Sequence, residues 1–300
     1  MTFDARQTPL LDPVNAALGV QLREQGQGGL VYEQALGARF HDHRGLSTLG
    51  SVGVLLDTAV AGTVYAALPS GKRSVAASLT VSSAGPVPVA GTVAVYGRIE
   101  NLDTEAGIGV ASGSLRDEDG TVCAIVSARG VVVDRNFDHG AESGAPELPP
   151  VTEPASGEDL RDRLGLDVVQ GIALGEIPRG AMAELMGLEV RIVETGAITA
   201  VLAPQEWMAN SMGTLQGGIL LAAADLICGL AAETATDPGE GYRVLDLRTD
   251  FVRSPAVTGP DIRLEANVVR VGRRIELVEA RIATDDGRLL TRASASVLRM

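Results

Sequence analysis

The sequence predicts an α+β protein made of two copies of one domain, in which an antiparallel sheet wraps around one long central helix. Two apolar segments of helical length each contain a single carboxylate, at Asp57 and Asp225. Several stretches of strand length follow each segment, with turn residues between them. One buried helix per copy, covered by an antiparallel sheet, accounts for both observations.

The two copies are detected as an internal repeat, which is the first feature to seek in a chain of 300 residues. Asp57 and Asp225 lie 168 positions apart. The same offset, without a gap, aligns Gly45 with Gly213, and further small or polar residues match at this spacing. We therefore interpret the chain as a tandem duplication whose halves have diverged in detail.

The repeat divides the chain into two domains of similar length. A segment rich in proline, glycine and acidic residues lies between them, lacks apolar periodicity and is predicted to be a linker. Each half is long enough to bury a core of its own. We expect an N-terminal domain at residues 1–135, the linker at 136–159 and a C-terminal domain at 160–300.

Each copy is predicted to contain a short helix, a strand pair, a loop, the central helix and a run of strands, in that order. In the second copy the short helix is 180–187, the strand pair is 188–193 and 197–202, and the central helix follows the glycine pair 217–218. Apolar and polar residues alternate along 262–268, which places one face of that strand on a core. The strands after the central helices are 75–83, 92–100, 108–117 and 121–133 in the first copy, and 243–254, 261–271, 274–284 and 288–298 in the second.

Composition limits the possible function classes. The net charge of −13 argues against nucleic acid or an anionic membrane as the main partner, since both need a basic field. No apolar span of 18 residues is expected and the N-terminus lacks a signal-peptide pattern, so we predict a soluble, cytoplasmic protein without membrane contact. Cys123 and Cys228 lack metal-binding spacing, and His41, His43 and His139 lack further ligands nearby, so we expect no disulfide and no metal.

The lone carboxylates of the central helices need a physical explanation. Burying an ionised carboxylate without a partner is costly and raises its pKa. Such an environment suits a general base or a nucleophile at the edge of a cleft. An aspartate that merely hydrogen-bonds a neighbouring loop is the structural alternative, but the equivalent positions of Asp57 and Asp225 favour the functional interpretation.

The second central helix and the loop before it carry small and polar residues at fixed spacing. These residues are Asn210, Gly213, Gln216, Gly217, Gly218 and Asp225. Six positions separate the asparagine from the glutamine, and nine separate the glutamine from the aspartate. A strand ending in Arg-Ser-Pro and a Gly-Arg-Arg turn follow. The pattern resembles the hot-dog acyl-CoA thioesterases of the phenylacetyl-CoA (PaaI) type, in which a His-Gly-Gly triplet occupies the place of Gln-Gly-Gly.

The resemblance implies acyl-CoA thioester hydrolysis and assigns parts of a site. In such enzymes a backbone N–H at the start of the central helix polarises the thioester carbonyl, which gives Gly217 and Gly218 this role. An aspartate from the partner subunit attacks the carbonyl or activates the attacking water. Here the partner is the other half of the chain. The glycine pair should therefore face Asp57, and Asp225 should face the first-copy turn 45–50. The structural alternative for the glycines is a tight loop-to-helix junction.

Differences between the copies predict one working site per chain, with Asp57 as its carboxylate. Arg270, Arg273 and Arg274 have no basic counterparts in the first copy, and they are the cations expected to bind the phosphates of coenzyme A. A solvated strand face is the alternative for these arginines. Coenzyme A would be part of the substrate, so no separate cofactor is expected. The resemblance also implies a homodimer of such double hot-dog chains.

Departures from the family pattern leave a second function open. Gln216 replaces the usual histidine and can donate a hydrogen bond through its amide, but it cannot carry a proton. Val244 stands where several relatives have a hydroxyl residue that assists the water, and Asp42 replaces the asparagine in the first copy. A non-catalytic acyl-CoA-binding or regulatory protein is the alternative. A hydratase would want an Asp and His pair, and the second copy contains no histidine.

Overall fold

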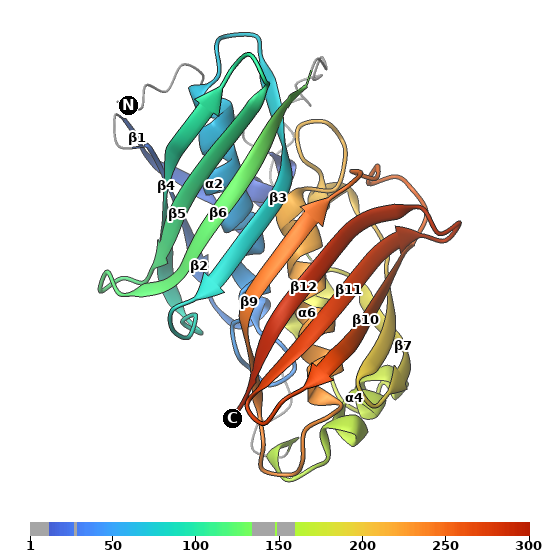
Figure 1. Cartoon of the computed structure of the whole chain (residues 1–300). Helices are drawn as coiled ribbons and strands as arrows, with labels where there is room; N and C mark the ends of the chain where they lie inside the picture. The colour runs from blue at the N-terminus through green and yellow to red at the C-terminus, as the bar shows by residue number, and fades with distance from the viewer. Residues whose placement is uncertain (1–11, 27–28, 134–147, 149–159) are drawn as a thin grey trace.

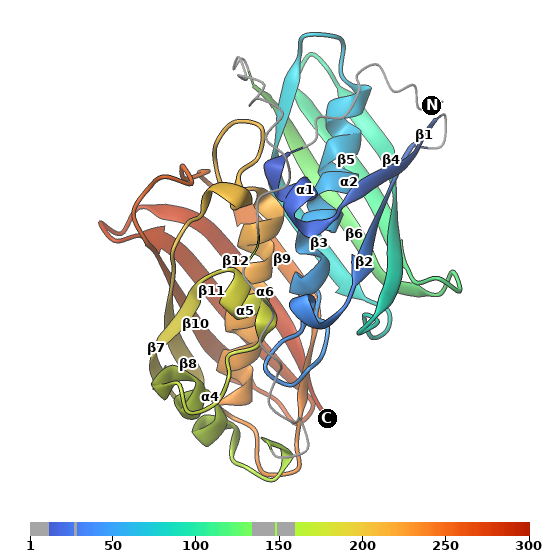
Figure 2. The same ribbon diagram turned by 180° about the vertical axis from the view of Figure 1, so that it is seen from behind.

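The computed structural model describes residues 12–26, 29–133, 148 and 160–300. Within them, a twelve-stranded antiparallel sheet carries two long helices, α2 (Gly53–Ala67) and α6 (Gly217–Glu233), on one side (Figures 1 and 2). The predicted linker at 136–159 lies outside the described residues except for residue 148. The shorter helices and turns are α1 (Pro13–Leu18), η1 (Ala38–Phe40), η2 (Gly50–Val52), α4 (Gly165–Leu174), α5 (Ala181–Leu185) and η3 (Glu206–Met208).

The strands of the two halves have the same order in the sheet. Each half begins at an outer hairpin and ends at the strand that directly follows its long helix, so the full order is β1-β2-β4-β5-β6-β3-β9-β12-β11-β10-β8-β7. The strands are β1 (Gln21–Gly26), β2 (Gly29–Leu36), β3 (Arg73–Ser83), β4 (Gly91–Asp103), β5 (Ile108–Arg116), β6 (Val122–Val133), β7 (Leu188–Glu194), β8 (Ala197–Leu202), β9 (Tyr242–Phe251), β10 (Ile262–Val271), β11 (Ile275–Thr284) and β12 (Leu289–Arg299).

The two halves join through β3 and β9 at the centre of the sheet. These strands are antiparallel, and Thr80 pairs with Arg248, the residue 168 positions later. That offset is the period of the sequence repeat, so equivalent residues of the two copies meet at the junction. The predicted tandem architecture, with the halves related as an internal pseudo-dimer, is therefore the observed one.

Most predicted elements match the observed ones within a few residues, but one helix was not predicted. Helix α4 lies between the predicted linker and the second-copy hairpin, and it packs on β7 and α6. Its buried side chains include Val168, Val169 and Ile172. In the first copy, strands β1 and β2 form the outer hairpin, and Gly26 pairs with Gly29.

Helix α2, together with the turn before it, corrects one expectation. Residues Gly50–Ala67 form an 18-residue span with a mean hydropathy of 1.3, so an apolar span of that length does occur. However, 78% of the span is buried inside the protein, where α2 contacts α6 and the first-copy strands. A helix that is apolar nearly all round is expected at such a place in a core.

The two long helices approach closely at a pair of glycines. A Cβ on Gly218 would lie 2.4 Å from the carbonyl oxygen of Gly53, and a Cβ on Gly53 would lie 2.5 Å from that of Gly218. Glycine is required at this crossing because side chains would separate the backbones. The contact brings the N-terminus of α6 to the first turns of α2, where Asp57 lies.

Candidate active site

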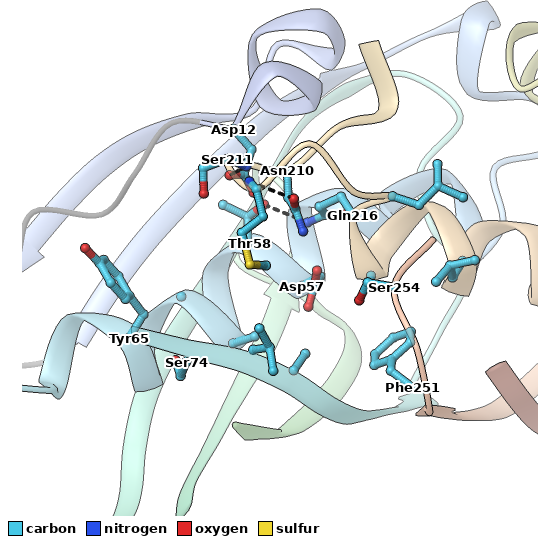
Figure 3. Close-up of a pocket in the computed structure, with 18 of the residues that line it drawn as sticks. Asp12, Asp57, Thr58, Tyr65, Ser74, Asn210, Ser211, Gln216, Phe251 and Ser254 are labelled. Carbon is cyan, nitrogen blue, oxygen red and sulfur yellow. Dashed lines mark hydrogen bonds between the residues drawn. The ribbon is translucent and has the colours of Figure 1, made fainter. Parts of the chain in front are cut away.

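A cavity of about 130 Å³ lies between the two halves, where the N-terminus of α6 meets the middle of α2. Helix α2 contributes Asp57, Thr58 and Tyr65, and the loop before α6 contributes Asn210 and Gln216 (Figure 3). The beginning of β3 and the end of β9 complete the wall. We call it the Asp57 cavity.

Asp57 points into this cavity opposite the glycine pair of α6, as the sequence predicts (Figure 3). Its Oδ2 accepts the N–H of Gly218 at 3.2 Å, whereas its Oδ1 is buried and has no hydrogen-bond partner among the residues that the structure describes. Burial raises the pKa of Asp57 to about 7, and the negative charge of Asp12 adds to the rise, while the N–H groups of Gly218 and Gly217 oppose it. Asp57 therefore titrates near neutral pH.

Gln216 links the start of α6 to α2. Its Oε1 accepts the N–H of Gly218 at 2.7 Å, which caps α6, and its Nε2 donates to Thr58 Oγ1 at 3.3 Å. The Thr58 hydroxyl in turn donates to Asn15 Oδ1 at 2.9 Å. The amide therefore fixes the start of α6 against α2, and its donation to a substrate stays a prediction.

The two glycines serve different purposes. A Cβ on Gly217 would lie 2.9 Å from Asp57 Oδ2 and 3.2 Å from the ring of Phe251, so a side chain there would intrude on the carboxylate. Gly218 instead faces the backbone of α2 at Gly53. Of the two interpretations weighed for the pair, access to the site fits Gly217, and a tight junction fits Gly218.

Asn210 lines the cavity but its side chain shapes the loop. Its Oδ1 accepts the N–H groups of Met212 at 2.9 Å and Thr214 at 3.1 Å. In the first copy Asp42 makes the equivalent bond to the N–H of Arg44 at 2.9 Å. Asparagine and aspartate both form this local turn, so the structure gives Asn210 a role in holding the loop.

Two polar residues of the site were missed by the sequence reasoning. Asp12, at the N-cap of α1, lines the cavity, and its Oδ1 accepts the N–H of Ser211 at 2.7 Å. Asn15, on the same helix, receives the hydroxyl bond described above. The repeat distinguishes Asp12 as a difference between the two copies, because the 168-residue offset places Gly180 at the equivalent position in the second copy.

A second cavity, of about 100 Å³, surrounds Asp225. Asp225 Oδ2 accepts the N–H of Gly50 at 2.9 Å, which mirrors the bond between Asp57 and Gly218. Burial raises the pKa of Asp225 to about 6. The pairing of Asp225 with the first-copy turn is thus the predicted one.

A cationic side chain occupies part of this second cavity. Arg44 lies 3.6 Å from the ring centroid of Tyr242, donates to the carbonyl oxygen of Tyr242 at 2.7 Å and pairs with Asp42 at 2.9 Å. Burial acts to raise the pKa of Asp42, but the Arg44 guanidinium outweighs it and holds that pKa below its usual value. The Asp57 cavity contains no such cation among the described residues that line it.

The arginines expected to bind coenzyme A phosphates do not line the Asp57 cavity. Arg270 is the residue before the last of β10, and Arg273 and Arg274 lie in the turn that follows. This end of β10 lies beside the β7–β8 turn, where the N–H of Gly196 donates to Thr234 just beyond the C-terminus of α6. The cavity lies at the other end of α6, about 25 Å away along the helix axis. The sheet register thus places these side chains away from the cavity, and their binding to coenzyme A phosphates stays a prediction.

The histidines take part in local structure. His41 Nε2 lies 2.8 Å from the carbonyl oxygen of Val89, and His43 Nε2 lies 2.8 Å from a carboxylate oxygen of Glu233. His139 lies outside the described residues. Over the ranges that the structure describes, histidine, cysteine and acidic residues form no cluster of three or more that could hold a metal.

Structural comparison supports the fold over the whole chain. A hot-dog protein of unknown function from Alicyclobacillus acidocaldarius is similar at a TM-score of 0.62, with 13% identity, over 97% of this chain and 99% of the other. The acyl-CoA thioesterase II TesB2 of Mycobacterium marinum is similar at a TM-score of 0.60, with 14% identity, over 96% and 98%. At such identities these likenesses establish the tandem hot-dog fold.

Sequence comparison identifies the family. The family model of the thioesterase superfamily matches residues 212–291, which contain the helix α6 and most of the second-copy sheet. A protein of Saccharolobus solfataricus that carries the name of an esterase, SSO2140, is 30% identical over 126 residues, or 41% of this chain and 88% of that protein. The narrower likeness to the phenylacetyl-CoA type stays a prediction. The chain belongs to the thioesterase superfamily and is a tandem hot-dog protein of the thioester hydrolase class.

Proposed function

We propose that the chain hydrolyses an acyl-CoA thioester in the Asp57 cavity, at a composite site to which both halves contribute. The observation that carries the proposal is the carboxyl of Asp57. It lies in a cavity beside the N-terminus of α6, and within the described part of the chain its Oδ1 has no hydrogen-bond partner. A buried carboxylate with one oxygen left unbonded is suited to accept a proton from a bound water.

Asp57 acts in this proposal as the general base. A base is most effective when its pKa lies near the working pH, and the pKa of Asp57 is about 7 because of burial. Asp57 Oδ1 takes a proton from water while the water oxygen attacks the thioester carbonyl. The tetrahedral intermediate then collapses and the carbon–sulfur bond breaks. Asp57 returns its proton to the sulfur, so coenzyme A leaves as a thiol and the carboxylate is restored.

The start of α6 stabilises the oxyanion that forms during the attack. Unpaired N–H groups and the helix dipole favour negative charge at this end of a helix. Gln216 already accepts the N–H of Gly218, so we assign the N–H of Gly217 to the carbonyl oxygen. The absence of a side chain at Gly217 leaves room for the acyl group beside Asp57.

We further propose that the Asp57 cavity is the working site and that the Asp225 cavity is degenerate. The polar network around Asp57 has small or apolar counterparts at the other cavity. Asp12 corresponds to Gly180, Asn15 to Ala183, and Thr58 to Leu226. The second cavity is instead occupied in part by Arg44 and its partners. A substrate carbonyl would compete there with a packed guanidinium.

The test is release of free thiol from a panel of acyl-CoAs by the wild type, Asp57→Asn and Asp225→Asn, with acyl-CoA binding measured alongside. We expect turnover in the wild type and in Asp225→Asn, and a loss of at least about a hundred-fold in Asp57→Asn. Loss only in Asp225→Asn would reverse the assignment of the two cavities. Binding without turnover in the wild type would favour the alternative, a non-catalytic acyl-CoA-binding protein. The homodimer and the cytoplasmic location stay predictions.

A further inference from the structure

The N-terminal helix α1 forms part of the Asp57 site. Its N-cap residue Asp12 accepts the N–H of Ser211 from the second half at 2.7 Å, and Asn15 accepts the hydroxyl of Thr58 from α2 at 2.9 Å. Asp12 and Asp57 line the same cavity (Figure 3). A segment far away in sequence thus joins the loop before α6 to the helix that carries Asp57.

We propose that Asp12 is a positioning residue of the Asp57 site, which fixes the loop 210–216 through Ser211 and places a second carboxyl beside Asp57. This proposal rests on the proposed function, because Asp12 acts through the base assigned there. Its effect has two separable parts: the hydrogen bond that Asp12 accepts and the negative charge that it carries.

The pseudo-symmetry of the chain shows that the carboxyl is not needed to attach the helix. The N–H of Val14 in α1 donates to the carbonyl oxygen of Ala209 at 3.3 Å. At the equivalent place in the other half, the N–H of Met182 in α5 donates to the carbonyl oxygen of His41 at 3.0 Å. Both short helices are therefore held by the same backbone bond, with or without an acidic residue.

The residue in the position of Asp12 differs between the copies. Gly180 occupies it in the second copy, at a φ of 89°, and a Cβ there would lie 2.4 Å from the backbone of Asp42. A side chain is thus excluded at the Asp225 cavity. Asp57 and Asp225 each have a buried Oδ1 without a hydrogen-bond partner among the described residues, but a carboxyl at this position occurs only at the Asp57 cavity, which indicates a role specific to that cavity.

The charge of Asp12 acts in an environment with few other titratable groups. Among the described residues that line the cavity, the titratable ones are Asp12 before α1, Tyr32 on β2, and Asp57 and Tyr65 on α2; the start of α6, β3 and β9 add none. Arg73 donates to the Tyr65 hydroxyl at 3.1 Å. Burial raises the pKa of Asp12 to about 6, and the Asp12 charge is the second cause, after burial, of the raised pKa values of Asp57 and Tyr32.

The direction of the expected shift in the pH profile follows from the presence of Asp12 and Asp57 in one cavity. Asp57 must be ionised to accept a proton, so kcat/KM rises with pH through its pKa. This rising part of the pH profile is its acid limb. An ionised Asp12 disfavours a second negative charge on Asp57, so it keeps the acid limb at higher pH. Removing the charge lets Asp57 ionise at lower pH, by roughly 0.5–1 unit for a neighbouring carboxylate. Relative to activity at pH 8, activity at pH 6 should then rise roughly three- to five-fold.

The experiment compares pH profiles of kcat/KM for the wild type, Asp12→Asn and Asp12→Ala. Asparagine keeps an oxygen that can accept the Ser211 N–H, whereas alanine removes both the acceptor and the charge. We expect the acid limb to move to lower pH in both variants and kcat to fall further in Asp12→Ala. Asp167→Asn is the control, because this exposed residue of α4 loses the same charge away from both cavities.

Two outcomes overturn the proposal: an acid limb in Asp12→Asn that coincides with the wild-type limb, or an equal shift in the Asp167→Asn control. A readout independent of turnover is the titration of the Asp57 carboxyl carbon by NMR in the wild type and in Asp12→Asn. A lower midpoint in the variant supports the proposal, and an unchanged midpoint overturns it. If the wild type has no turnover, the proposed function fails while the NMR titration still decides the role of Asp12.

Discussion

Replacing Asp57 by asparagine should abolish hydrolysis and, at alkaline pH, stabilise the fold. The pKa of this buried carboxyl rises from 3.8 to about 7, chiefly through burial, and no described residue bonds its Oδ1. Ionising Asp57 in the folded protein is therefore unfavourable. Asparagine has the same shape, keeps an oxygen for the N–H of Gly218 and carries no charge, so it removes this cost.

The magnitude and pH window follow from linkage. A carboxyl whose pKa is higher in the folded state contributes stability that is fully present below its unfolded pKa and is lost as pH rises through its folded pKa. Between 3.8 and about 7 the loss is on the order of 4 kcal/mol at 1.36 kcal/mol per pH unit. The free energy of unfolding of Asp57→Asn should therefore equal that of the wild type near pH 4. Above pH 8 it should exceed the wild-type value by on the order of 4 kcal/mol.

The assay is urea unfolding of the wild type, Asp57→Asn and Asp225→Asn, followed by circular dichroism at pH 4.5 and 8.5. Asp225→Asn is the matched control, because the pKa of Asp225 is about 6 and its advantage should be on the order of 3 kcal/mol at pH 8.5. It should be stabilised like Asp57→Asn but keep its thioesterase activity. A difference between Asp57→Asn and wild type that is the same at both pH values would refute the reasoning.

Three glycine substitutions test the rest of the site. Gly217→Ala places a Cβ 2.9 Å from Asp57 Oδ2, so thiol release should fall about ten-fold or more. The free energy of unfolding in urea should change by less than about 1 kcal/mol. Unchanged turnover would contradict the role of Gly217 in leaving room for the acyl group. Gly218→Ala forces a Cβ to 2.4 Å from the carbonyl oxygen of Gly53, so the free energy of unfolding in urea should fall by about 1–3 kcal/mol. An unchanged free energy would refute the close contact between α2 and α6 at these glycines. Gly62→Val fills part of the Asp57 cavity, where a Cβ meets nothing within 4 Å. Since a cavity of about 150 Å³ holds benzene, kcat/KM should fall for acyl groups of that size and persist for acetyl-CoA; a uniform fall would contradict an acyl-binding role.

The architecture was predictable because it depends on the period of the sequence repeat and on the alternation of apolar and polar residues. Strand alternation and turn residues place most strands within a few residues, and the 168-residue offset even matches the pairing of Thr80 with Arg248. The same offset, with the resemblance, predicts that Asp57 faces the glycine pair. These features follow from the backbone topology, which a repeat and a binary pattern determine.

The roles of individual side chains were less predictable, since they depend on contacts between segments far apart in sequence. Gln216 caps α6 and bonds Thr58, which only the approach of α2 makes possible. The turn that contains Arg273 was assigned to the site because it is positively charged. The sheet places this turn at the far end of α6. Asp12 was missed because nothing in its local sequence indicates that α1 reaches across both halves.

Joining two copies in one chain relaxes a constraint that a symmetric dimer imposes. In a dimer of identical subunits every substitution at one site also occurs at the other, whereas here each cavity can change alone. The Asp225 cavity is lined by Arg44, which pairs with Asp42 and stacks on Tyr242, so its second carboxyl is neutralised. The Asp57 cavity has Asp12 as its second carboxyl, whose pKa burial raises, and no cation among its described lining residues. Since Asp57 and Asp225 both have raised pKa values, the second carboxyl without a cation at only one of two equivalent places is the physical reason to assign the chemistry there.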